Sequence, residues 1–327
     1  MESKYFYVIY NPVAGSGTAR AVWKIVSAAL AEQGVAYEIY ESQYPRHTVQ
    51  LAQQIALGEL KPNSVLLVMG GDGTLNEAIT GLHLSGNPQH LPVAYIPAGS
   101  GNDFARGIGL SQKPLVALKQ VLEATEPLHL DVGTYTELVS GKRGYFVNNF
   151  GIGFDAAVVT AANAAASKHL LNHVHMGALA YIAQVVHVLA RRRSFTITVT
   201  ANGKTETIKD AYLCTTTNHP YFGGGVRILP EARPDDGLLD LIVVDRPNLF
   251  AFASQALQSI AGRPVGKSTA RHHFKSDHIE ISTPTKQFAQ IDGETMAEQN
   301  YHVEFGLTEQ DFWIKPDKNA AKHAIKN

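Results

Sequence analysis

Three times in the first third of the chain, a short apolar run ends in a glycine-bearing loop that leads into a helical pattern. The apolar runs are residues 6–10, 65–69 and 93–96. Apolar strands that alternate with helices predict a parallel sheet covered on both faces, because right-handed crossovers place the helices there. We therefore expect a doubly wound α/β domain, with helices over residues 18–33 and from about Leu75 onward.

The three loops that follow these strands are suited to binding a phosphate group. Their sequences are NPVAGSG at residues 11–17, GGDGT at 70–74 and PAGSGND at 97–103. Glycines at a strand-to-helix junction let the backbone approach a phosphate, and the free N–H groups of the helix start carry a partial positive charge. All three loops lie beyond the carboxyl ends of the strands, where such sheets bind ligands. Asp72 and Asp103 beside them indicate a shared Mg²⁺.

A structural alternative is that these glycines only make turns and the aspartates only cap helices. For Gly15 and Gly17 the two interpretations stay open. For residues 70–74 we favour binding, because three such loops occur in neighbouring βα units and two of them carry an aspartate.

Beyond about residue 128 the pattern changes to β-branched runs separated by turn signals. The clearest runs are residues 195–200, 238–244, 279–282 and 301–305. Such runs predict an antiparallel β-sandwich. We therefore divide the chain into domains of residues 1–127 and 128–327, with the last strands returning to the first domain. Helical insertions are expected at residues 155–192 and 248–261.

The charges are balanced, with 28 Lys and Arg against 29 Asp and Glu, so no global field indicates nucleic-acid binding. The first residues lack the pattern of a secretory signal, so we expect a cytoplasmic protein. The longest apolar stretch, residues 176–189, is shorter than the ~20 residues needed to span a bilayer. The arginines at 191–193 are typical of a solvated helix end, and next to an apolar helical face they also suit peripheral contact with anionic headgroups. The single cysteine, Cys214, is expected in the core.

Two further motifs have the wrong context for a binding site. Residues 261–268 (AGRPVGKS) imitate a P-loop but follow a helical pattern instead of a strand. His169 and His173 share a helical face, with His175 nearby, yet no carboxylate or cysteine completes a zinc site. An exposed helix is therefore the preferred interpretation of the histidines.

The glycine loops and several later motifs together resemble a known family. They are residues 11–15 (NPVAG), 70–77 (GGDGTLNE), 99–105 (GSGNDFA), 129–133 (HLDVG), 148–155 (NNFGIGFD), 234–240 (PDDGLLD) and 291–294 (IDGE). This set closely resembles the diacylglycerol kinase catalytic domain, above all the soluble bacterial diacylglycerol kinases and related lipid kinases, over essentially the whole chain. The resemblance implies an α/β domain like that of NAD kinase and phosphofructokinase, followed by a β-rich lipid-binding domain.

The resemblance also implies which residues bind ATP. They are Asn11, Pro12, Val13, Ala14, Gly15, Ser42, Gly71, Asp72, Gly73, Thr74, Leu75, Asn76, Glu77 and Ser100. Ser42 and Ser100 stand where many relatives carry threonine, and they retain the hydroxyl group that would bind phosphate.

Two magnesium sites follow from the same resemblance. An acidic network around the catalytic Mg²⁺ maps onto Asp72, Asp103 and Asp131. A second, structural Mg²⁺ would be held by the carboxylate of Asp236 and by two backbone carbonyls, those of Arg233 and Leu238. Hard oxygen ligands in a tight turn suit Mg²⁺, although without the resemblance this segment would be interpreted simply as a turn.

A lipid hydroxyl is a poor nucleophile, so a carboxylate should accept its proton during phosphoryl transfer. The resemblance gives this role to Asp292 or Glu294, on a motif that reaches from the second domain into the cleft. We take Glu294 as the base and Asp292 as the orienting group or alternate base. A structural alternative, that Asp292 and Gly293 form only a type I′ hairpin turn, stays open.

The resulting prediction is an ATP- and Mg²⁺-dependent kinase that phosphorylates the hydroxyl of diacylglycerol, giving phosphatidic acid, or of a related membrane lipid. The protein would work at the inner face of the membrane, and its relatives suggest a homodimer. The identity of the lipid stays open. Two other functions remain in competition: an NAD kinase-like phosphotransferase, which shares the GGDG loop, and a non-catalytic nucleotide or lipid sensor.

Overall fold

The computed structural model describes residues 4–87, 91–153, 194–222, 224–227, 229–245 and 271–317. Some of the expectations above lie outside these ranges. They are the helical insertions at 155–192 and 248–261, the histidines at 169, 173 and 175, the arginines at 191–193 and the P-loop-like segment at 261–268.

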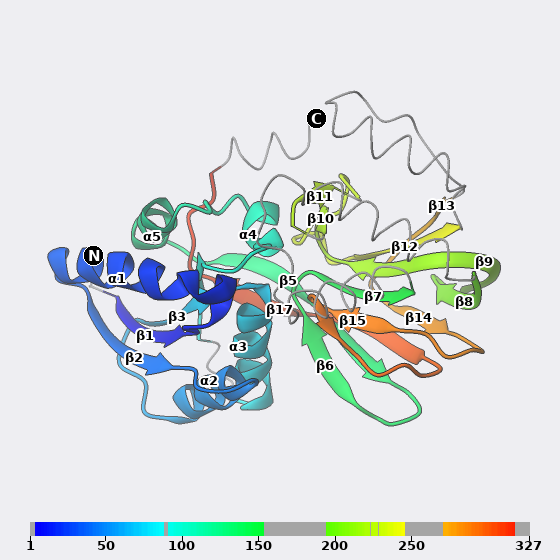
Figure 1. Cartoon of the computed structure of the whole chain (residues 1–327), viewed down its shortest axis with the longest axis horizontal. Coiled ribbons are helices and arrows are strands. Elements are labelled where there is room, and N and C mark those ends of the chain that lie inside the picture. Colours follow the sequence, from blue (N-terminus) through cyan, green and yellow to red (C-terminus); the bar gives the residue numbers. More distant parts are fainter. Residues whose placement is uncertain are drawn as a thin grey trace.

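The first lobe is a parallel sheet with helices on both faces (Figure 1). Its strands are β1 (Tyr5–Tyr10), β2 (Ala36–Glu41), β3 (Ser64–Gly70) and β4 (Val93–Pro97), in the order β4-β3-β1-β2. Its helices are α1 (Thr18–Glu32), α2 (His47–Leu57), α3 (Asp72–Leu84), α4 (Asp103–Gly107) and α5 (Pro114–Leu122), with a short turn η1 at Ala14–Gly17. Helices α1 and α5 pack together on one face, and α2 and α3 on the other. The doubly wound prediction is confirmed.

The burial of the strands explains why their apolar runs predicted this sheet correctly. Residues 65–69 of β3 are completely buried, because helices cover both faces and leave no side for polar residues. One boundary differs from the prediction: α3 begins at Asp72, not near Leu75. In the GGDGT segment, Gly70 therefore ends β3, Gly71 is the N-cap, and residues 72–74 form the first turn of the helix.

The second lobe consists of antiparallel strands, which confirms the sandwich prediction. They are β5 (Leu128–Glu137), β6 (Arg143–Phe146), β7 (Asn149–Gly153), β8 (Phe195–Ala201), β9 (Lys204–Thr217), β10 (Tyr221–Phe222), β11 (Val226–Arg227), β12 (Leu239–Asp245), β13 (Arg271–Ser276), β14 (Ile279–Ser282), β15 (Ala289–Ile291), β16 (Glu294–Thr295) and β17 (His302–Phe312). The core is rich in aromatic rings. Phe150 and Phe305, for example, meet edge to face with their centroids 5.1 Å apart. Cys214 is buried in β9, as predicted.

Strand β17 joins the two lobes into one sheet (Figure 1). Along its whole length it pairs antiparallel with β5, and at its end Phe312 pairs parallel with Val93 of β4. The backbone N–H of Trp313 then donates to the carbonyl of Val93 at 2.8 Å. The sequence predicted a strand only over residues 301–305, because the residues that continue it are mostly polar or glycine and hide the strand pattern.

Candidate active site

The three glycine loops meet at the carboxyl ends of β1, β3 and β4. The backbone N–H of Asn11 donates to the carbonyl of Met69 at 3.0 Å, and that of Ala98 donates to the carbonyl of Gly70 at 2.7 Å. The side-chain amide of Asn11 also donates to Thr74 Oγ1 at 3.1 Å. The loops predicted from three separate stretches of sequence therefore form one continuous surface.

Two glycines of this surface cannot be replaced without moving the backbone. A Cβ atom on Gly99 would lie 2.4 Å from the Cα atom of Gly71. Gly15 has a positive φ of 57°, and a Cβ there would lie 2.5 Å from the carbonyl oxygen of Ala98. The close approach of the loops thus requires glycine at these positions.

Two helix amino termini open onto the same surface. Helices α1 and α3 have glycine at the N-cap position, Gly17 and Gly71, and no side chain caps their first N–H groups. Uncapped N–H groups at the start of helices of 15 and 13 residues carry a partial positive charge. The surface is therefore suited to an anion such as a polyphosphate.

Asp72, the first residue of α3, turns its carboxylate toward the start of α4, where Asp103 is buried. The Asp72 carboxylate accepts the backbone N–H groups of Asp103 at 3.0 Å and of Phe104 at 3.2 Å. Burial raises the pKa of Asp72, and the neighbouring charge of Asp103 raises it further against these hydrogen bonds. Asp103 Oδ2 accepts the N–H of Gly224 at 2.8 Å, whereas its buried Oδ1 has no hydrogen bond and lies 3.7 Å from Arg106 Nε.

This pair fits the predicted catalytic Mg²⁺. A buried carboxylate oxygen without a hydrogen bond is a ready ligand for a hard cation. Among the described residues no three acidic, histidine or cysteine side chains gather as a metal site. Mg²⁺ does not require three, because it is commonly held by one or two carboxylates together with substrate phosphates and waters.

Asp292 lies at a hairpin turn, yet its carboxylate is fully occupied by contacts across the cleft. It accepts the backbone N–H groups of Val147, Asn148 and Asn149 at 2.8–3.0 Å and the amide of Asn76 at 2.8 Å. Positive φ angles at Asp292 (48°) and Gly293 (88°) form the turn between β15 and β16. Asp292 and Gly293 therefore do form a hairpin turn, and this turn also places the Asp292 carboxylate next to its four hydrogen-bond donors.

Glu294, two residues later, is exposed and faces the amino terminus of α3. Its Oε1 atom lies 3.3 Å from the place that a Cβ on Gly73 would take, and the described residues supply no hydrogen bond to its carboxylate. Its charge, second to burial, raises the pKa of nearby Glu77. A cavity of about 750 Å³ opens in front of Glu294, with walls from both lobes. Glu294 is thus a carboxylate free to take a proton beside the anion-binding surface.

Comparison with known proteins identifies the family and the fold. Residues 5–135 match the family described as the diacylglycerol kinase catalytic domain, and residues 149–306 match the YegS C-terminal NAD kinase beta sandwich-like domain. Over 300 residues the chain is 30% identical to the provisionally named lipid kinase YtlR of Bacillus subtilis (strain 168), covering 90% of this chain and 94% of that protein. The chain belongs to the diacylglycerol kinase family of lipid kinases.

Other members of the diacylglycerol kinase family and its fold neighbours agree. The diacylglycerol kinase of Bacillus subtilis (strain 168) is 25% identical over 288 residues, which is 88% of each chain. A solved diacylglycerol kinase structure from Bacillus anthracis str. Sterne has a TM-score of 0.67 at 22% identity, covering 96% of this chain and 97% of that chain. Yeast NADH kinase complexed with NADH has a TM-score of 0.50 at 12% identity, covering 100% of this chain and 88% of that chain. The NAD kinase-like fold is confirmed.

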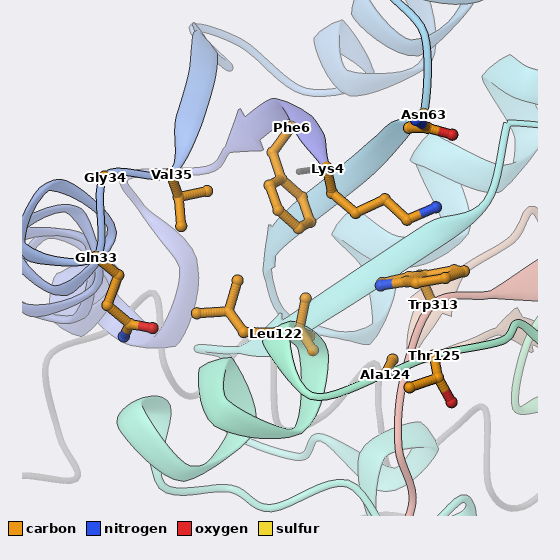
Figure 2. A pocket seen from close by; sticks show the side chains of 11 residues that line it. Lys4, Phe6, Gln33, Gly34, Val35, Asn63, Leu122, Ala124, Thr125 and Trp313 are labelled. Carbon is orange, nitrogen blue, oxygen red and sulfur yellow. The ribbon is translucent and has the colours of Figure 1, made fainter. Parts of the chain in front are cut away.

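Within the described part of the chain, no helix is both long and apolar enough to cross a membrane. A second cavity, of about 570 Å³, lies at the opposite edge of the first sheet, near the starts of β1 and β3 (Figure 2). There the ammonium of Lys4 lies 3.7 Å from the centre of the Trp313 ring. Its position, away from the glycine loops, separates it from the kinase site.

The hydrogen bonds of Asp131, which the family resemblance assigns to the acidic network around the catalytic Mg²⁺, are made with the 234–237 turn. Its carboxylate accepts the N–H of Gly237 at 2.8 Å, and its backbone N–H donates to the carbonyl of Pro234 at 2.7 Å. Burial raises the pKa of Asp131, and the negative charges of nearby carboxylates, first of all that of Asp236, raise it further. Among the described residues no contact joins Asp131 to Asp72 or Asp103, so its side chain supports the 234–237 turn.

The second, structural magnesium site does not fit the residues present. Asp236 Oδ1 accepts the N–H of Leu238 at 3.2 Å, and Asp236 Oδ2 lies 2.7 Å from the ammonium of Lys275. The same ammonium lies 3.7 Å from the completely buried Asp240. Arg233 is turned toward Asp235 in a two-pronged ion pair. A divalent ion on Asp236 would stand against Lys275, so the lysine supplies the positive charge that the family resemblance assigned to a metal.

Replacing Lys275 by methionine tests this assignment. We expect a loss of about 3 kcal/mol in the free energy of unfolding, because the variant leaves a buried carboxylate poorly paired. Without nucleotide, Mg²⁺ should not stabilise the wild type, but it should restore part of the loss in the variant. Thermal and denaturant unfolding with and without Mg²⁺ would show this, with Lys286→Met, an exposed lysine, as the control. Stabilisation of the wild type alone by Mg²⁺ would contradict the assignment.

The charge of Asp292 makes stability depend on pH. Burial raises the pKa of this carboxyl from 3.8 to about 7, against the lowering effect of the backbone N–H groups. Because the folded pKa lies above the unfolded one, the contribution to stability is fully present below pH ~4 and is lost as pH rises through ~7. Relative to Asp292→Asn, the wild type should therefore lose up to about 1.4 kcal/mol for each pH unit in this range. Denaturant unfolding at several pH values would measure it, and a difference that rises with pH would refute it.

Two residues of the site were missed by the sequence prediction. Asn148 and His219 are buried side chains that hydrogen-bond each other, and the backbone N–H of Asn148 donates to Asp292. The Asn148-Asn149 pair was visible as a motif, since two adjacent amides between apolar residues are unusual, but nothing in the sequence assigned it a role. His219 had no signal, because a single histidine after a strand is most often a surface residue.

Proposed function

We propose that this chain is an ATP- and Mg²⁺-dependent lipid kinase that phosphorylates the hydroxyl of diacylglycerol or of a related membrane lipid. The observation that supports it most is the placement of Glu294, a free carboxylate at the mouth of a large cavity and beside the uncapped start of α3. A base next to an anion-binding helix terminus suits transfer of a phosphoryl group to an alcohol.

In the proposed reaction, Glu294 accepts the proton of the lipid hydroxyl while the hydroxyl oxygen forms a bond to the γ-phosphorus of ATP. The bond from that phosphorus to the bridging oxygen breaks, and ADP leaves with the electron pair. The loop N–H groups stabilise the charge that spreads over the transferred group. Mg²⁺, when bound at Asp72 and Asp103, would neutralise the phosphate oxygens.

Asp292 serves in this proposal as the orienting group. Four donors of the protein engage its carboxylate, whereas the carboxylate of Glu294 is exposed at the cavity, so the proposal gives the substrate proton to Glu294. Through Asn76 it ties α3 of the first lobe to the 147–149 backbone of the second. This contact fixes the distance between Glu294, on the turn after Asp292, and the phosphate-binding loops.

The remaining proposed ATP contacts follow the three loops. Asn11 and Thr74 hold two of the loops together, whereas Ser42 is buried beside the end of β1 and Ser100 is exposed between two glycines. Val13 has 71% of its surface exposed, which suits a residue that would cover the nucleotide.

The cavity in front of Glu294 supports a lipid acceptor. Its lining includes apolar and aromatic residues of both lobes, namely Val49, Leu84, Tyr135, Tyr145, Met296 and Tyr301. Charged side chains, among them Arg46, Lys142 and Arg143, share the walls with these residues, so the cavity suits an amphipathic glycerolipid whose hydroxyl reaches the base. Peripheral contact with the inner face of the membrane, a cytoplasmic location and a homodimer belong to the same proposal.

A test is to supply purified protein with Mg·ATP and, separately, dioleoylglycerol, other extracted membrane lipids and NAD. We expect phosphate transfer to a lipid and none to NAD. Turnover with NAD alone would replace the proposal by the NAD kinase alternative, for which the similarity in fold to yeast NADH kinase is the supporting observation. Binding of Mg·ATP without transfer to any acceptor would instead support a sensor.

A further inference from the structure

Asn148 lies between the two carboxylates that the proposed kinase site depends on. Its backbone N–H donates to Asp292 Oδ1 at 2.8 Å, and its side-chain amide lowers the pKa of Asp72 as a donor to that carboxylate would. Two ionised carboxylates repel each other, and the charge of Asp72 contributes to the raised pKa of Asp292. Asn148 therefore acts on both carboxylates, one through its backbone and the other through its side chain.

The direction of this amide matters, because it has a donor end and an acceptor end. With its NH₂ group toward Asp72, Asn148 donates to a carboxylate. Turned by half a rotation, it would place its oxygen against that carboxylate, an acceptor against an acceptor. The correct direction requires a partner for Asn148 Oδ1 that can only donate.

His219 is that partner. Its ring is 1% exposed, and its Nε2 atom is hydrogen-bonded to Asn148 Oδ1. Its other nitrogen, Nδ1, lies 3.1 Å from the backbone N–H of Tyr221. Because a backbone N–H can only donate, Nδ1 must accept, and in a neutral ring the proton then sits on Nε2. Burial lowers the pKa of His219 to about 3, so the ring stays neutral at ordinary pH.

Other contacts hold this segment rigidly. Thr217 Oγ1 donates to the carbonyl of Asn148 at 3.0 Å, which fixes the Asn148 backbone. A Cβ on Gly107, the last residue of α4, would lie 3.2 Å from the His219 side chain, so the ring packs closely against the helix that carries Asp103. The histidine thus has little freedom to turn.

We propose that His219 is a positioning residue of the kinase site: the Tyr221 N–H fixes its tautomer, and its Nε2–H fixes the Asn148 amide so that Asn148 donates to Asp72. This rests on the proposed function, since it gives Asp72 its orientation toward Mg·ATP. His219 lies outside the family motifs, and in this proposal it indirectly stabilises the two neighbouring carboxylates, Asp72 and Asp292, by holding Asn148 in place.

Two substitutions separate this role from simple packing. His219→Leu has a similar volume and no donor, whereas His219→Gln places an amide N–H near the position of Nε2. Both lose the acceptor for the Tyr221 N–H, and His219→Leu also leaves Asn148 Oδ1 without its donor, so both should lose stability and His219→Leu somewhat more. Only His219→Leu should also weaken Mg·ATP binding, by about 10- to 100-fold, as removal of a group behind a metal ligand commonly does. The KM for the lipid should not change in either variant.

The experiment is calorimetry of Mg·ATP binding, thermal unfolding and lipid kinetics on the wild type and both variants, with Ile281→Ala, at a buried core position of β14, as a control. Ile281→Ala should lower stability and leave Mg·ATP affinity near that of the wild type. Equal affinities of the folded Leu and Gln variants would overturn the proposal. If the wild type itself binds no Mg·ATP, the proposed function fails, which is a different result.

A second measurement does not depend on the variants folding. In ¹⁵N-labelled wild type, the His219 ring should show a protonated Nε2 and an unprotonated Nδ1 from about pH 5 to about pH 8, the range in which ordinary histidines titrate. The resonance is assigned by its loss in His219→Gln or, should that variant not fold, by through-bond correlation in the wild type. A proton on Nδ1, or a ring that titrates within this range, would overturn the proposal.

Discussion

Replacing Glu294 by glutamine should lower kcat for lipid phosphorylation by about 10²- to 10⁴-fold, the usual contribution of a general base. The change is isosteric and exposed, so the fold should be unaffected. Because Glu294 faces the start of α3 without touching a positive group, Mg·ATP affinity should stay the same or increase slightly as a negative charge is removed. Initial rates with a radiolabelled phosphate donor, together with calorimetry of Mg·ATP, would measure both quantities.

Glu298→Gln is the matched control, since it makes the same change in the same exposed segment and should leave kcat near its wild-type value. Asp292→Asn provides the second comparison. If Asp292→Asn removed turnover at full stability while Glu294→Gln remained active, the assignment of base and orienting group would have to be exchanged.

Replacing Asp72 by asparagine should abolish the strengthening of ATP binding by Mg²⁺. The wild type is expected to bind ATP much more tightly when Mg²⁺ is present, because the buried pair of Asp72 and Asp103 repels a bare triphosphate and attracts a hard cation. The variant has one negative charge where the wild type has two. Its NH₂ group replaces one of the two carboxylate oxygens that accept the backbone N–H groups of Asp103 and Phe104, and an NH₂ group cannot accept a hydrogen bond there. We expect a fall in kcat of at least about 10²-fold, comparable with the loss of one electrostatic contact in other enzymes.

Titrations of ATP with and without Mg²⁺ would decide this prediction. Asp131→Asn, run in parallel, should retain the Mg²⁺ effect, since Asp131 contacts the 234–237 turn instead of the Asp72 pair. An Asp72→Asn variant that still binds ATP more tightly in Mg²⁺ would show that the cation is held elsewhere.

The sequence predicted best the part of the fold that is buried on both faces, namely the central strands of the first lobe. The apolar runs of β1, β3 and β4 and the glycines after them leave few alternatives, because the loops approach so closely that only glycine fits at Gly15 and Gly99. The far end of β17 stayed hidden, since its polar residues follow no strand pattern and its partners, β4 and β5, lie far away in sequence.

The same distinction applies to the site. Asp72, Asp103, Asp292 and Glu294 belong to short motifs, so a resemblance could point to them, and the structure brings them to one cleft. The contacts of Asp131, Lys275 and His219 depend on pairings between distant strands and turns, which no local pattern reports. The sequence suggested a metal at Asp236, and only the register of β12 against β13 shows that Lys275 stands beside it.

The position of β17 affects how the protein folds during its synthesis. The side-chain amide of Gln310 donates to the carbonyl of Leu91 across a separation of 219 residues. The edge of the first sheet at β4 is therefore covered only after residues up to 310 have left the ribosome. Until then an unpaired strand edge is exposed to other chains, and closing so long a loop is slow. The nucleotide-binding half should therefore aggregate when it is produced alone, and the complete chain should depend on chaperones during synthesis.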